Sequence, residues 1–80
     1  MKKLNIIYED KEIIVINKEA GLLTIATEKD KEHNLYHYVR EYLAKKNQKV
    51  FIVHRLDKYT SGLVLFAKSP SIQKIMQSNW

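Results

Sequence analysis

The sequence predicts an α+β fold, with a mixed, mainly antiparallel sheet and two helices. Short runs rich in Ile, Val and other strand-forming residues alternate with polar turns, which is typical of β-strands. Two further segments repeat apolar residues at spacings of three and four, which is typical of amphipathic helices. The chain has 80 residues, so it forms at most one small domain with a modest core.

The first two strands are expected at residues 4–8 and 12–17, joined as a hairpin by a polar turn. Residues 13–16 are apolar at every position, which predicts a strand covered on both faces. Gly21 then marks a turn in which it adopts a positive φ. A third short strand is expected at residues 22–25.

The charged residues 27–32 predict a surface loop, and an amphipathic helix is expected over residues 33–46. Lys45 and Lys46 would lie in its last turn, where positive charge favours the helix dipole, and Asn47 would end it. The apolar face of this helix repeats at helical spacing and consists of Leu35, Tyr38, Val39, Tyr42 and Leu43.

Two more strands are expected at residues 50–53 and 63–67. Ser69 and Pro70 then form an N-cap followed by proline at the first helical position. The apolar face of this second helix consists of Ile72, Ile75, Met76 and Trp80. A bulky apolar residue at the last position predicts that the domain is incomplete after Trp80.

The composition favours a polyanionic partner, with RNA first among the candidates. The net charge is +5, nearly all of it from lysine, and Arg40 and Arg55 are the only arginines. A lysine-rich protein without a partner remains the alternative. There is no cysteine, which excludes disulfides and thiolate chemistry. No apolar run is long enough to span a membrane, so we expect no membrane partner and a cytoplasmic location.

The run His54 to Ser69, HRLDKYTSGLVLFAKS, combines a polar loop with a strongly apolar strand. Asp57 follows a basic pair in this loop, and the strand holds the loop in place. A side chain in such a position can be rigid and still reach a substrate, so Asp57 is the candidate catalytic residue. An isolated aspartate in a loop is more often a turn or capping residue.

The segments HRLD, TSGL and FAK of this run resemble the signature of the RluA-like family of pseudouridine synthases, which isomerise uridine in RNA. The upstream run Asn17 to Leu22, NKEAGL, resembles a second family motif, except that Glu19 replaces the usual proline. The resemblance covers nearly the whole chain. It implies that residues 1–80 are the N-terminal portion of such a catalytic domain, incomplete after Trp80.

The resemblance implies specific roles. Asp57 would be the catalytic carboxylate, and Arg55 would enter the RNA as the target base is flipped out. Thr60, Ser61 and Gly62 would form the turn that positions the aspartate. The family also uses a tyrosine against the flipped base and a basic partner of the aspartate. Both lie downstream of the region matched here. The reaction is an isomerisation, so no cofactor is expected.

Several side chains have simpler interpretations. His54 is more often structural than an acid–base group in such a setting. His33 and His37 share a helical spacing that could hold a metal, but no third ligand matches, so no metal site is predicted. The tyrosines at 36, 38 and 42 could stack on bases, although core packing fits the last two better. The lysines at 45, 46 and 49 read as a solvated helix end.

Three functions follow from these observations. The first is an RNA pseudouridine synthase acting on rRNA or tRNA through Asp57. The second is a basic RNA-binding fragment without catalysis. The third is a fragment that associates through exposed edges of an incomplete sheet, for example as a homodimer.

Overall fold

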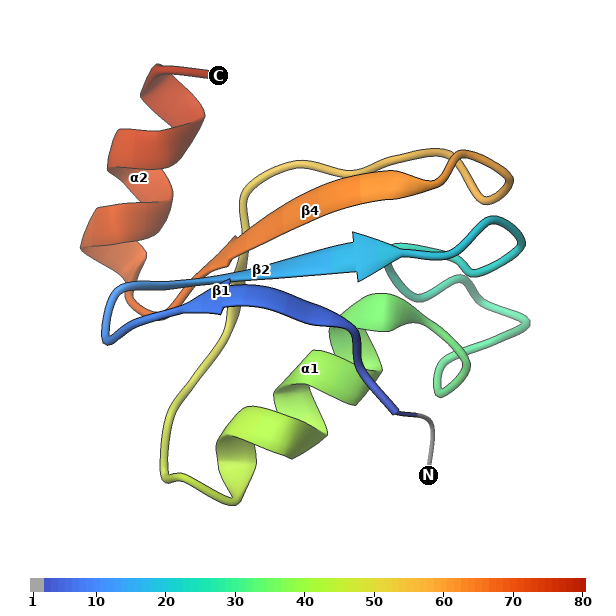
Figure 1. Cartoon of the computed structure of the whole chain (residues 1–80), viewed down its shortest axis with the longest axis horizontal. Helices are drawn as coiled ribbons and strands as arrows, with labels where there is room; N and C mark the ends of the chain where they lie inside the picture. Colours follow the sequence, from blue (N-terminus) through green and yellow to red (C-terminus); the bar gives the residue numbers. More distant parts are fainter. Residues whose placement is uncertain (1–2) are drawn as a thin grey trace.

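The computed structural model describes residues 3–80 and contains four strands and two helices (Figure 1). Their bounds in chain order are β1 (Ile6–Glu9), β2 (Ile13–Lys18), α1 (Leu35–Ala44), β3 (Phe51–Ile52), β4 (Gly62–Ala67) and α2 (Pro70–Ser78). The strands form one sheet in the order β1-β2-β4-β3, and every neighbouring pair is antiparallel. The predicted α+β class with a mainly antiparallel sheet is confirmed.

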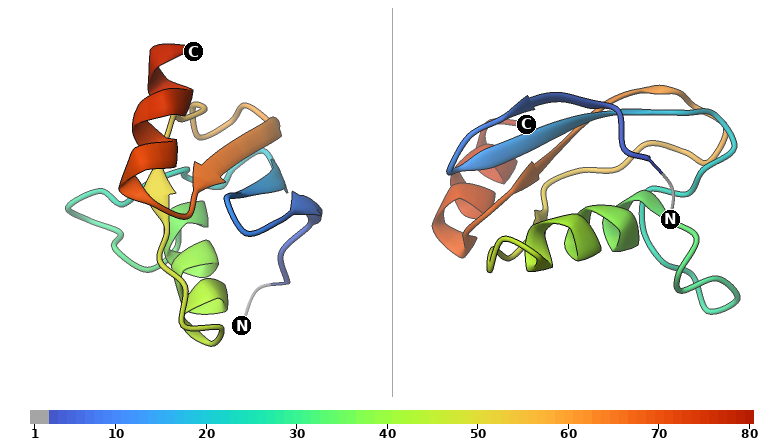
Figure 2. Two further views of the ribbon diagram at one scale, coloured as in Figure 1. Left: turned by 90° about the vertical axis from the view of Figure 1, so that its left-hand side faces the viewer. Right: turned by 60° about the horizontal axis from the view of Figure 1, so that its bottom comes forward.

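The core lies between one face of the sheet and α1, which runs beneath it (Figures 1 and 2). The alternation of a strand sends every second side chain to the same face. The inward face of the sheet meets the predicted apolar stripe of α1. The buried residues of this core are Ile14 and Ile16 of β2, Val64 and Phe66 of β4, and Leu35, Val39 and Leu43 of α1.

The opposite face of the sheet is covered only at the end where α2 packs, at Ala67, so the prediction that β2 is buried on both faces is wrong. Ile13 and Val15 are only half-buried, and Leu63 of β4 is 57% exposed. The apolar run of β2 therefore reflects strand propensity on an open face rather than two layers of cover. Ile7 of β1 adds to this exposed apolar face.

The expected strand at residues 22–25 is absent. Leu23 forms only an isolated parallel bridge to Asn34, and the carbonyls of Leu23 and Thr24 accept hydrogen bonds from the first amides of α1 instead of from a strand. The expected strand at 50–53 shortens to Phe51–Ile52, since the chain then leaves the sheet to form the loop that contains Asp57.

The first helix is shorter than expected. Asn34 caps its start by accepting a hydrogen bond from the His37 N–H, and its regular part ends at Ala44. Asn47 adopts a left-handed φ of 58° just beyond the helix, as its predicted role requires. Lys46 is not in the last turn. Its ammonium bonds to Glu9 of β1 and ties the end of the helix to the sheet.

The second helix begins as predicted, with Ser69 as N-cap and Pro70 in the first turn. Within α2 no residue is fully buried, and Ile75 remains 53% exposed. The helix lies against the end of β3 and β4. Gln73 and Gln77 donate to the Ile52 carbonyl, at 2.8 and 3.3 Å. These glutamines satisfy a backbone group on β3, the edge strand, and so make that edge less available for pairing.

Among the described residues, no helix is both long and apolar enough to cross a membrane.

Candidate active site

Two loops, which carry the two motifs of the sequence, meet at one end of the sheet (Figure 1). The first follows β2, and the second, residues 53–61, precedes β4. The strands pair up to their ends, with Lys18 opposite Gly62. The Gly21 N–H donates to the Lys58 carbonyl at 2.8 Å. Positive φ at Gly21 (93°) and at Gly62 (142°) lets each loop turn where it meets the sheet, and this agrees with the prediction for Gly21.

The candidate catalytic residue, Asp57, is the first residue of a tight turn and is exposed to solvent. The Thr60 N–H donates to the Asp57 carbonyl at 3.0 Å and closes this turn. Arg55, two residues earlier, is also exposed, as are Thr60 and Ser61. The carboxylate and guanidinium therefore both face the solvent from one loop, where a polymer such as RNA could reach them.

Thr24 holds the residue that directly precedes Asp57. Its hydroxyl donates to the Leu56 carbonyl at 2.7 Å and accepts from the Leu56 N–H at 3.1 Å. The Thr24 residue is 1% exposed. One buried hydroxyl thus takes the place of a neighbouring strand for both backbone groups of Leu56. This fixes the direction in which the chain enters the Asp57 turn.

Lys18 holds the residue that directly follows Asp57. Its ammonium donates to three backbone carbonyls: Lys58 at 3.0 Å, Leu22 at 2.7 Å and Glu19 at 3.1 Å. The residue is 1% exposed, and such complete burial is rare for a lysine. Together with Thr24, it clamps the Asp57 loop on both sides of the aspartate.

The charge of Lys18 also acts on the site. Burial lowers the pKa of Lys18, because the charged form is less well solvated there. The negative charges of Glu19 and Asp57 oppose this shift. The Lys18 ammonium and the Asp57 carboxylate are therefore close enough for their charges to interact. A basic group near the aspartate is therefore already present in this chain.

His54 has a structural position. Its Nε2 accepts a hydrogen bond from the Leu65 N–H at 3.1 Å, which satisfies β4 where β3 has already left the sheet. The ring stacks on Trp80, with 4.0 Å between the ring centroids. Burial lowers the pKa of His54, so the neutral ring that can accept this bond is favoured.

The other histidines do not form a metal site. His33 lies before α1 rather than on it and bonds to Asp30, whereas His37 pairs with Glu41. No group of three potential ligands occurs among residues 3–80. Tyr42 packs against the core and donates to Glu9, as expected. The other tyrosine packed against the core is Tyr36 rather than Tyr38, whose half-buried ring lies against His37.

Sequence analysis did not identify Lys18 and Thr24. A signal for Lys18 exists, because it continues the alternation of Ile14 and Ile16 and so must point to the buried face. A lysine at an inward position needs hydrogen-bond partners, and these had to come from the adjacent loops. Thr24 carried a weaker signal, as a hydroxyl within an apolar run.

Comparison with known proteins agrees with this geometry. The sequence profile of the family described as RNA pseudouridylate synthase matches residues 12–80. The chain belongs to this family. Its two motif loops, which the structure brings together, both lie within the matched region, and the expectation of an RluA-like sequence is confirmed.

Individual relatives are similar over nearly the whole chain. The tRNA pseudouridine synthase C of Haemophilus ducreyi is 39% identical over 78 residues, which cover 98% of this chain. The dual-specificity RNA pseudouridine synthase RluA of Vibrio cholerae is 38% identical over 77 residues, or 96% of this chain. The structure of human RNA pseudouridylate synthase domain containing 4 superimposes with a TM-score of 0.71, at 27% identity over 92% of this chain.

These matches span only part of each relative. The aligned regions make up 32% of the Haemophilus ducreyi protein, 30% of the Vibrio cholerae protein and 28% of the human chain. The chain therefore corresponds to about a third of the length of the proteins it matches.

Proposed function

We propose that this chain supplies the catalytic carboxylate of an RNA pseudouridine synthase, with Asp57 as that carboxylate. The observation that carries the proposal is the clamp around the aspartate. Buried Thr24 and Lys18 hold the residues on either side of Asp57, while the carboxylate itself remains exposed. A rigid backbone with an accessible side chain is what a catalytic nucleophile needs.

The reaction requires one such group. The N1–C1′ glycosidic bond of uridine breaks, the base rotates, and a C5–C1′ bond forms. The proton lost from C5 balances the one gained at N1. The Asp57 carboxylate can attack C1′ or C6 to form a transient covalent bond, or it can assist by removing a proton. Each route needs an ionised carboxylate, and Lys18 supplies a buried positive charge that interacts with Asp57.

The target uridine has to leave its stack before a carboxylate can reach it. Arg55 is exposed two residues before Asp57, so its planar guanidinium can occupy the vacated space. We propose that this step occurs on rRNA or tRNA in the cytoplasm, where such RNA substrates are found. His54, Thr60, Ser61 and Gly62 support the loop rather than the chemistry.

The 80-residue chain by itself is expected to be inactive. We propose that it is the N-terminal portion of a catalytic domain, because the tyrosine and the basic residue that the family uses against the flipped base and the aspartate have no match here. The second candidate, an RNA-binding fragment without catalysis, is favoured by the net charge of +5. The third candidate, self-association as a homodimer, is supported by the exposed apolar residues on the outer face of the sheet.

A chimera tests the assignment. This chain would replace the matching third of the Haemophilus ducreyi tRNA pseudouridine synthase C, and tritium release from 5-labelled uridine in tRNA would report turnover. Asp57→Asn keeps the shape but removes the nucleophilic charge, so turnover should disappear while RNA binding stays. Asp30→Asn is the matched control, on an exposed loop, and should remain active. An Asp57→Asn rate within tenfold of the unmodified chimera would contradict the assignment.

A further inference from the structure

We propose that a groove between α1 and β3 binds the single-stranded RNA that flanks the target uridine. A base would lie against Tyr36, and phosphates would lie against Arg40 and Lys49. The choice of RNA as ligand rests on the proposed function. The position of the groove rests on the structure alone.

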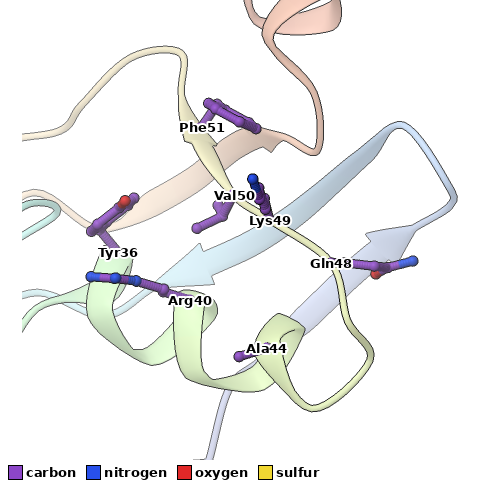
Figure 3. Close-up of a pocket in the computed structure, with 7 residues that line it drawn as sticks. All are labelled: Tyr36, Arg40, Ala44, Gln48, Lys49, Val50 and Phe51. Carbon is purple, nitrogen blue, oxygen red and sulfur yellow. The ribbon is translucent and has the colours of Figure 1, made fainter.

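The groove is a hollow of about 400 Å³ next to the edge of the sheet. It is lined by Tyr36, Arg40, Ala44, Gln48, Lys49, Val50 and Phe51. Figure 3 shows Tyr36 and Arg40 projecting from α1, with Val50 across from them just before β3, whereas the Phe51 ring points away from them. A second hollow, beside the loop of residues 26–31, shares Tyr36 and Arg40 with the first, so the two form one continuous depression.

The charges in this depression favour an anionic ligand. Arg40 and Lys49 are both exposed. Within residues 3–80 neither side chain makes an ion pair or hydrogen bond, so both cations are available. No carboxylate lines the first hollow, and Glu28 lines only the second. Arg40 is one of two arginines in the chain. Arginine combines phosphate contact with stacking, which lysine does not.

Tyr36 provides a surface for a base. Its ring packs against Phe66 of the core, with 6.4 Å between the centroids, and is only half-buried. A ring that is held by the core and open to solvent on the other side loses little freedom when a base stacks on it. This combination of a stacking platform and cations is typical of single-stranded RNA sites.

The depression leads to the candidate active site. The Tyr36 N–H donates to the Thr24 carbonyl at 2.9 Å, and the Thr24 hydroxyl bonds to both backbone groups of Leu56, next to Asp57. A short chain of contacts therefore joins one end of the groove to the Asp57 loop. An RNA strand whose uridine lies at Asp57 can continue along α1 into the groove.

A protein segment could in principle occupy the same hollow. RNA fits better, because the first hollow combines two unpaired cations with the aromatic ring of Tyr36 and has no acidic side chain. A second copy of this chain, which also carries a net charge of +5, would bring further positive charge to it.

Binding of a fluorescent oligouridylate to the 80-residue chain tests the proposal, with anisotropy measured over a range of salt concentrations. The double variant Arg40→Ala/Lys49→Ala removes two phosphate contacts. The slope of log K against log salt should then fall by about 1.4, since each contact on a single strand contributes about 0.7. The control Lys11→Ala/Lys74→Ala removes the same charge from exposed positions outside the groove and should leave the slope unchanged.

Tyr36 separates stacking from charge. Tyr36→Leu should weaken binding about 5- to 150-fold, whereas Tyr36→Phe keeps an aromatic face and should bind like the wild type. Circular dichroism checks that each variant is folded. Equal loss in the two charge pairs, or no detectable binding by the wild-type chain, would overturn the proposal. So would a change in sedimentation, rather than in RNA affinity, for the Arg40→Ala/Lys49→Ala variant. None of these results bears on Asp57, which is tested by turnover of the chimera.

Discussion

Replacement of Lys18 by methionine tests whether the buried ammonium holds the Asp57 loop. Methionine fills most of the space of the lysine stem but donates no hydrogen bonds. The substitution leaves the carbonyls of Glu19, Leu22 and Lys58 without the donor that lies 2.7–3.1 Å away in the wild type. It also removes a buried charge, whose desolvation cost is recovered.

The size of the effect follows from these contacts. An unpaired buried acceptor costs about 1–3 kcal/mol, and the lower end applies here because water can reach carbonyls in surface loops. Three carbonyls then amount to about 3 kcal/mol, before the recovered desolvation reduces this to about 2 kcal/mol. For a domain of this size each kcal/mol lowers Tm by about 4–8 °C, so we expect a decrease of about 8–16 °C.

Thermal denaturation followed by circular dichroism measures this shift. Lys11→Met is the matched control, because Lys11 is exposed in the turn between β1 and β2. The amide resonances of Asp57 and Lys58 should also move in Lys18→Met, whereas those of α2 should not. If Lys18→Met melts within about 2 °C of Lys11→Met, the ammonium does not hold the loop and the reasoning is refuted.

Three further predictions concern other parts of the molecule. Burial disfavours the ionised form of Glu9, but hydrogen bonds from Lys68, Tyr42 and Lys46 outweigh this and lower its pKa from 4.5 to about 2. The resulting stabilisation, about 1–2 kcal/mol after solvent screening, is present above pH 4.5 and lost as the pH falls toward 2. Urea denaturation should show this loss in the wild type, and parallel pH profiles for the wild type and Glu9→Gln would contradict it. Arg55→Ala in the chimera should lower the single-turnover rate more than the RNA affinity, and equal losses would make it a simple phosphate contact. Leu63→Glu places a charge on the exposed apolar face of the sheet and should abolish self-association in sedimentation experiments. A wild-type chain that sediments as a monomer would contradict self-association through this face.

Much of the local structure could be predicted from the sequence, because it depends on neighbouring residues. The hairpin, the apolar face of α1 and the Ser69–Pro70 start of α2 all come from periodicity and capping within a few positions. The candidate catalytic residue Asp57 also came from a contiguous motif. What that motif does in this chain remains a prediction until turnover is measured.

Only the tertiary structure decided what surrounds that residue. Thr24 bonds to Leu56, 32 positions away, and Lys18 bonds to Lys58, 40 positions away. The predicted strand at 22–25 is absent for a similar reason, since the carbonyls of Leu23 and Thr24 accept hydrogen bonds from the start of α1 instead of from a strand. The open face of the sheet was decided in the same way. A run of apolar residues indicates a strand, but whether a second layer covers it depends on where the helices pack. In this protein α1 packs on the other face, and α2 covers only the end of this one, at Ala67.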